Sequence, residues 1–114
     1  MSRSFIAKIV AAIGCAVAAN AAFAAAQMRI TEFMYSGSDG EFVEFTNVGD
    51  STQDMAGWSF DDDGETPGSV DLGGFGTLQP GESAILTEAS EQSFRSAWNL
   101  CAAQKIIGGN SHNL

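Results

Sequence analysis

The clearest pattern along the chain is an alternation of side chains in the segment 41–46. Val43 and Phe45 fall on one side of an extended backbone, whereas Phe42 and Glu44 fall on the other. A period of two is typical of a β-strand that has one face in a core. We therefore predict a strand here, with Val43 and Phe45 facing inward.

The preceding segment, 29–35, is also rich in residues that suit a strand, but its alternation is imperfect. Ile30 and Phe33 cannot face the same side of a regular strand, because successive side chains point to opposite faces. If both enter the core, a β-bulge near Thr31 and Glu32 is required. Since a turn of Ser, Gly and Asp residues follows, the two strands are predicted to form a hairpin whose outer face carries carboxylates.

Further strands are predicted where short apolar runs are bounded by Gly, Pro and Asp. The segment 55–60 is one of them, and Trp58 is expected to be its buried anchor. The segment 83–87 is expected to be a buried strand that follows a turn at 78–81. The remaining expected strands are a short edge strand at Val70 and Leu72 and a short strand at 105–107.

Between Ser90 and Cys101 the apolar period changes from two to about 3.6, which predicts a helix. Ser90 is the candidate N-cap, and Glu91 suits the positive end of the helix dipole. The predicted apolar stripe consists of Phe94, Ala97, Trp98 and Cys101. We expect this helix to cover one end of the sheets.

Four of these signatures follow one another in a fixed order: RITEFM at 29–34, EFVEFTN at 41–47, DMAGWSF at 54–60 and TLQPG at 77–81. Together they resemble the lamin tail domain, an immunoglobulin-like β-sandwich found in nuclear lamins and in many secreted bacterial proteins. The Gly57-Trp58 pair and the turn at Pro80-Gly81 match that family's pattern. The resemblance implies an all-β, immunoglobulin-like β-sandwich in which the short helix is an insertion.

An immunoglobulin-type sandwich needs about 100 residues and roughly seven strands. The pattern supplies fewer strands, and the segment 108–114 is rich in Gly and Asn with no strand after it. We therefore expect residues 27–114 to form an incomplete lamin-tail-like domain. The missing strands would follow Leu114 or come from a partner.

Residues 1–26 have the three parts of a cleaved secretory signal peptide. The apolar run 9–19 is too short for a helix that crosses a bilayer, which needs roughly 20 residues. Small residues at Ala24 and Ala26 would direct cleavage before Gln27. The mature chain is therefore expected to be secreted or periplasmic and to have no membrane span.

Two alternatives to this cleavage remain open. Ala22 and Ala24 offer a second cut that would release Ala25, and the segment could instead stay as an uncleaved anchor. A lipoprotein reading of Cys15 is disfavoured, because the residues before it lack the usual leucine and the apolar run continues past it.

The charge balance excludes one class of partner. The five Lys and Arg residues face 14 Asp and Glu residues, which gives a formal net charge of −9. Loss of the signal peptide removes Arg3 and Lys8 and makes the chain more acidic still. Because sequence-independent binding to nucleic acid depends on Lys and Arg at phosphates, direct nucleic-acid binding is not expected. Divalent cations and basic partners remain compatible with this charge.

One cluster of carboxylates suggests a metal: Asp61, Asp62, Asp63 and Glu65. Calcium takes six to eight oxygen ligands, but this spacing does not fit an EF-hand, which would need Gly at Thr66 and Glu at Leu72. The alternatives are a weak calcium site and a solvated acidic turn. Glu32 and Glu44 form a second carboxylate pair, expected on one outward face of the hairpin.

Catalytic machinery is not predicted. The single histidine is His112, there is no Gly-x-Ser-x-Gly motif, and His112 with Cys101 cannot complete a zinc site. Cys101 is expected to be a small core residue or to pair with a cysteine beyond Leu114. We expect a non-catalytic binding or structural module for a protein or glycan partner, without a cofactor other than calcium. The alternative is an accessory domain of a longer secreted hydrolase or nuclease.

Overall fold

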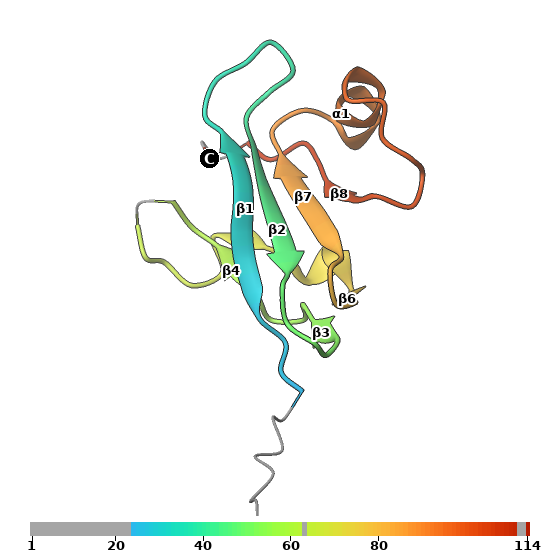
Figure 1. The fold of residues 1–114 in the computed structure, drawn as a ribbon. Helices are drawn as coiled ribbons and strands as arrows, with labels where there is room; N and C mark the ends of the chain where they lie inside the picture. Colours follow the sequence, from blue (N-terminus) through green and yellow to red (C-terminus); the bar gives the residue numbers. More distant parts are fainter. Residues whose placement is uncertain (1–23, 63, 112–113) are drawn as a thin grey trace, which may run out of the picture.

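The computed structural model describes residues 24–62, 64–111 and Leu114, and it consists mainly of strands (Figure 1). The longer strands are β1 (Met28–Met34), β2 (Phe42–Asn47), β7 (Ser83–Thr87) and β8 (Lys105–Ile107). The short strands are β3 (Gln53–Asp54), β4 (Ser59–Phe60), β5 (Val70–Asp71) and β6 (Thr77–Leu78). One α-helix, α1 (Glu91–Ala97), and one 3-10 helix, η1 (Gly73–Phe75), complete the described elements.

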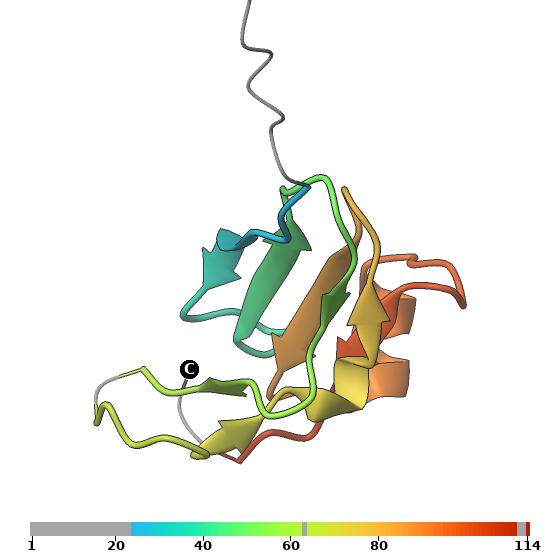
Figure 2. The same ribbon diagram turned by 90° about the horizontal axis from the view of Figure 1, so that it is seen from below.

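The strands form two layers. The main sheet has the order β1-β2-β7-β8, and only its β7–β8 pair is parallel. Two antiparallel ribbons, β3–β6 and β4–β5, make the opposite layer, which Figure 2 shows facing the main sheet. The core between the layers consists of Val43, Phe45, Ala84 and Leu86 from the main sheet and Met55, Leu72, Phe75 and Leu78 from the opposite side.

The predicted alternation of β2 is confirmed. Val43 and Phe45 enter the core between the layers, whereas Phe42 enters a separate cluster on the outer face with Ile85 and Phe94. The rings of Phe42 and Phe94 meet edge to face, with their centroids 5.3 Å apart. Helix α1 therefore covers the end of the outer face at which Phe42 lies, as the pattern indicated.

The β-bulge predicted in the first strand is present, because the register of β1 against β2 shifts between Ile30 and Glu32. Ile30 pairs with Phe45 and Phe33 pairs with Val43, so both side chains share the inner face of the sheet. They are not buried, however: Ile30 is 54% exposed and Phe33 is 67% exposed. The hairpin pattern predicts on which face a side chain lies, but not whether the opposite layer reaches it.

The prediction for segment 55–60 is wrong in two respects. Only Ser59–Phe60 is a strand, and Trp58 is 42% exposed instead of being the core anchor. The Trp58 N–H donates to the Met55 carbonyl at 3.0 Å, and Gly57 has a φ of 79°, which glycine adopts without strain. This turn interrupts the strand alternation, and Met55 becomes the fully buried residue.

The helix is shorter than predicted, although its N-cap is confirmed. Ser90 Oγ accepts a hydrogen bond from the Ser93 N–H at 3.1 Å. The helix ends at Ala97, and Asn99 adopts a positive φ of 51° just after it. Phe94 is the buried member of the predicted stripe, while Ala97, Trp98 and Cys101 are exposed. Cys101 lies beyond the helix as a free thiol, so its prediction as a core residue is wrong.

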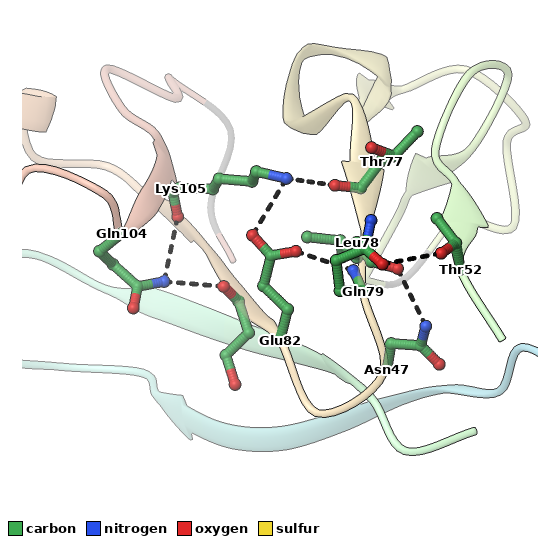
Figure 3. Close-up of polar contacts among 9 residues, drawn as sticks. Asn47, Thr52, Thr77, Leu78, Gln79, Glu82, Gln104 and Lys105 are labelled. Carbon is green, nitrogen blue, oxygen red and sulfur yellow. Dashed lines mark hydrogen bonds and ion pairs between the residues drawn. The ribbon is translucent and has the colours of Figure 1, made fainter. Parts of the chain in front are cut away.

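Asn47, at the end of β2, joins the two layers and is fully buried (Figure 3). Its Nδ2 donates to the carbonyls of Leu78 in β6, at 3.0 Å, and of Ser51, at 2.8 Å. Its Oδ1 accepts from the N–H groups of Gln27, at 3.2 Å, and Gly49, at 3.1 Å. These bonds use both donors and both acceptor sites of the amide. A buried polar group is stabilising only when its hydrogen bonds are made, as they are here.

The turn that enters β7 packs against the same residue. The Glu82 N–H donates to the Gln79 carbonyl at 2.9 Å, with Pro80 and Gly81 at the two central positions and Gly81 at a φ of 79°. Pro followed by a positive-φ Gly is the preference of a type II turn. The Gly81 N–H also donates to the Asn47 carbonyl at 2.7 Å, so the predicted turn is confirmed and is tied to β2.

Lys105 adds a second link between the layers (Figure 3). Lys105 Nζ lies 3.0 Å from Glu82 Oε1 and also donates to the Thr77 carbonyl of β6. The pKa of Glu82 is lowered, chiefly because the carboxylate accepts a hydrogen bond from the Gln79 N–H. Partial burial opposes this shift, and Lys105 adds to it.

Two substitutions test whether Met55, and not Trp58, is the buried residue of this segment. Met55→Ala should lower the free energy of unfolding by about 2–5 kcal/mol, the range for a truncated buried Met, Leu or Ile. Trp58→Ala should cost much less, since that ring is already in contact with water. Urea unfolding of both variants decides the point. If Trp58→Ala is the more damaging change, Trp58 is the anchor after all.

Glu82 is predicted to make stability depend on pH. A carboxylate with a lowered pKa in the folded state stabilises it above the unfolded pKa, about 4.3, and this contribution is lost as the pH falls through the folded pKa. Glu82→Gln should therefore lower the free energy of unfolding at pH 7 by roughly 1 kcal/mol or less. The difference in unfolding free energy between Glu82→Gln and the parent should become smaller below about pH 4.

Glu65→Gln, on an exposed carboxylate of the acidic loop, controls for the loss of one negative charge. Melting temperatures of the three chains between pH 3 and pH 7 provide the comparison. If the difference in melting temperature between Glu82→Gln and the parent stays constant with pH, the lowered pKa of Glu82 is contradicted.

Candidate functional site

An apolar groove runs along the inner face of β1, between the main sheet and the β4–β5 ribbon. One hollow, of about 140 Å³, is lined by Ile30, Phe33, Met34, Tyr35, Phe42, Val43, Phe60 and Leu114. A second hollow, of about 170 Å³, is lined by Met28, Arg29, Ile30, Phe45, Met55, Trp58, Ser59 and Leu72. Ile30 borders both hollows, so they are neighbours on the β1 side of the molecule. We call the two hollows together the β1–β4 groove.

The groove exposes large apolar side chains on both walls. Ile30, Phe33 and Tyr35 on the β1 side are all more than half exposed, and Trp58 beside β4 is 42% exposed. Single exposed apolar residues are common on protein surfaces, but a contiguous group marks a binding site or an aggregation risk. Ile30 and Phe33 lie on the inner face of the main sheet, where a sandwich ordinarily buries its side chains.

The groove has this form because the opposite layer is narrower than the main sheet. Among the described residues, β4 pairs with β5 alone, and β1 pairs with β2 alone. Each of these strands therefore has one edge without a strand neighbour in the described part of the chain. The opposite layer covers β2 and β7, where the core residues lie, and leaves β1 uncovered.

Leu114 already occupies one end of the groove. It lines the same hollow as Ile30 and Phe33 and packs against the core cluster. Its N–H lies 3.2 Å from Glu41 Oε2, which accepts the hydrogen bond. The hollow thus accommodates an aliphatic side chain whose backbone amide meets a carboxylate.

Charged groups of both signs lie in or next to the groove. Glu41 meets Leu114 at one end, and Asp61 and Asp62 follow β4 directly. Arg29 lines the second hollow. The other basic residues of the described chain, Arg95 and Lys105, form ion pairs with Glu91 and Glu82.

The structure brings together only part of the predicted metal cluster. Asp61 Oδ2 accepts a hydrogen bond from the Thr66 N–H, which closes the acidic loop. Asp62 and Glu65 are exposed, and Asp63 lies outside the described residues. Within the described ranges, no three His, Cys, Asp or Glu side chains are grouped as metal ligands. Because one of the four candidate ligands is not described, calcium binding stays a prediction.

Glu32 and Glu44 do pair across β1 and β2, as predicted for the outward face. They line a small hollow of about 100 Å³ with Phe42, Ile85, Phe94, Trp98 and Leu100. Thr31 Oγ1 donates to Glu44 Oε1 at 2.5 Å, so a hydroxyl stabilises one of the two carboxylates. His112 lies outside the described residues.

The residues that the pattern did not identify as functional are Tyr35 and the pair of layer links, Asn47 and Glu82. Tyr35 follows β1 in a bend, where its ring extends the apolar wall. A signal for Asn47 was present in principle, because a polar residue falls on the inward phase set by Val43 and Phe45.

Comparison with known proteins identifies the family. The family model described as Lamin Tail Domain matches residues 21–113. Searches of curated proteins and of solved structures gave no match. In the described part of the chain, no helix has the length and apolar character to cross a membrane. The family and the two-layer strand arrangement confirm the predicted immunoglobulin-like β-sandwich with one short helix. The chain belongs to the Lamin Tail Domain family.

Proposed function

We propose that the chain is an exported, non-catalytic module that binds another macromolecule through the β1–β4 groove. The observation that carries this proposal is the exposure of Ile30, Phe33 and Trp58 on facing walls of one groove. Burial of apolar surface drives most protein association, at roughly 25 cal/mol per Å². A partner that fills this groove would gain that free energy.

The absence of a catalytic role is part of the same proposal. It is supported by the family, an immunoglobulin-like fold without catalytic function, although fold alone does not determine function. It is also supported by the composition of the groove, whose lining consists mainly of aliphatic and aromatic side chains. General acid–base catalysis requires titratable groups within hydrogen-bond reach of a substrate. Ile30, Phe33 and Trp58 supply no such group.

Export is supported by the sequence alone, since residues 1–23 lie outside the described part of the chain. The basic start, the short apolar run and the small residues at Ala24 and Ala26 favour a secretory leader. Cleavage before Gln27 or before Ala25 would leave β1 intact, because β1 begins at Met28. We place the mature module in the periplasm or outside the cell.

One experiment tests both parts of this proposal. The full chain is expressed in a Gram-negative host, and the intact mass of the exported protein is measured. Its N-terminus should be Gln27 or Ala25. The purified protein is then added to washed envelopes of the source organism, before and after treatment of the envelopes with protease, and the bound fraction is measured.

The parent chain should be retained by the envelopes and Phe33→Ser should not, since the substitution removes an exposed apolar ring from the groove. Val48→Ser is the matched control, because Val48 is 44% exposed but lies outside the groove. Loss of binding after protease treatment would identify a protein partner, whereas unchanged binding would indicate a glycan. Equal retention of the parent and Phe33→Ser, or an intact Met1 in the exported fraction, would contradict the proposal.

A further inference from the structure

We propose that a hollow on the outer face of the main sheet receives the side chain of a lysine from a partner protein. The hollow measures about 100 Å³ and is lined by residues of β1, β2, β7 and the end of α1. Its walls combine the carboxylates of Glu32 and Glu44 with apolar side chains, among them Trp98. Because it lies on the opposite face of the main sheet, this site is separate from the β1–β4 groove.

The size of the hollow indicates a single side chain as its ligand. Pockets that enclose a whole drug-sized molecule measure about 300–1,000 Å³, several times the volume found here. Phe42, Ile85 and Phe94 line the hollow and are almost fully buried, so they form a closed apolar floor. Long basic side chains suit such a surface, because their methylene stems pack on apolar groups while the charged end stays at a polar rim.

The two carboxylates at the hollow have no basic partner in the described part of the chain. Glu32 and Glu44 lie opposite each other across β1 and β2, and like charges in this position repel. The ion pairs among the described residues lie elsewhere, at α1 and at β8. Arg29, in β1, forms no ion pair with either carboxylate. A cation in the hollow would therefore offset the repulsion between them.

A chain of hydroxyl groups holds Glu44 in place. Thr31 Oγ1, in the bulge of β1, donates its single proton to Glu44 Oε1 at 2.5 Å. Thr31 therefore accepts from Thr46 Oγ1 at 2.7 Å, and Thr46 in turn accepts from Ser83 Oγ at 2.7 Å. The hydrogen bonds thus run in one direction across three strands and end at the carboxylate. A carboxylate that is already ordered loses less side-chain entropy when it binds a cation.

Trp98 gives the hollow an aromatic wall that is fixed but open to solvent. Its ring stacks on Phe94 with the centroids 5.8 Å apart, and it meets Phe42 edge to face at 5.6 Å. Despite these contacts, Trp98 is 41% exposed. Tryptophan is the aromatic side chain that attracts cations most strongly. The indole and the two carboxylates therefore favour the same kind of ligand.

The arrangement of the carboxylates favours lysine over arginine. A guanidinium group binds best as a planar fork to both oxygens of one carboxylate. Glu44 Oε1 already accepts the Thr31 hydroxyl, and the second carboxylate comes from a different strand. An ammonium group is compact and has three rotatable donors, so it can meet one oxygen of each glutamate.

The test is an NMR titration of the full chain with a capped Gly-Lys-Gly peptide and three analogues, in which norleucine, Nε-acetyl-lysine or arginine replaces the lysine. The lysine peptide should bind and should shift the indole N–H resonance of Trp98 and the amide resonances of Glu32 and Glu44. The norleucine and acetyl-lysine peptides should bind about tenfold more weakly, because they lose the ion pair and the cation–π contact. The arginine peptide should also bind more weakly than the lysine peptide.

Matched variants locate the site. Glu44→Gln and Trp98→Leu should each weaken binding of the lysine peptide roughly fivefold. Glu65→Gln removes an exposed carboxylate outside the hollow, and Trp58→Leu changes an indole of nearly equal exposure on the other face. Both controls should leave the affinity unchanged. Phe33→Ser, which alters the β1–β4 groove, should not change it either.

Thermal stability separates a binding role of the carboxylates from a structural one. Since Glu32 and Glu44 repel each other in the free chain, Glu32→Gln should melt at the same temperature as the parent or higher, although it binds the lysine peptide less tightly. A melting temperature well below that of Glu65→Gln would mean that Glu32 supports the fold, and would overturn the inference. Equal binding of the norleucine or arginine peptide, or equal weakening by Glu65→Gln, would overturn it as well.

Discussion

The fold depends on one buried amide, that of Asn47. Its four hydrogen bonds connect the residue before β1, the loop after β2 and the β6 strand of the opposite layer. Such a network is stabilising only when it is complete, because an unpaired buried polar group costs about 1–3 kcal/mol. The backbone of Asn47 also holds the turn that enters β7, through the Gly81 N–H and the Glu82 carbonyl.

The links between the layers are concentrated on one side of the sandwich, and this determines where the groove lies. The Asn47 amide and the Lys105 ammonium group both join the main sheet to β6. On the opposite side, β4 and β1 face one another with Ile30, Phe33 and Trp58 exposed between them. The same architecture that closes the core at β6 thus leaves the inner face of β1 open.

The sequence predicted the features that depend on neighbouring residues. These include the alternation of β2, the bulge in β1, the Pro80-Gly81 turn and the Ser90 N-cap. It did not predict which of two apolar residues would be buried. The chain turns at Gly57, so that Met55 is buried in the core and Trp58 is exposed. The groove was not predictable either, since the exposure of Phe33 depends on the width of a layer formed by distant segments.

The central claim is that the groove is open in the isolated chain, and Trp58 reports on it directly. In a Trp98→Phe chain, Trp58 is the remaining tryptophan. Its fluorescence should be readily quenched by acrylamide, because the ring of Trp58 is 42% exposed. Poor quenching and blue-shifted emission in the isolated, monomeric chain would mean that Trp58 is buried in the core, and would contradict the account.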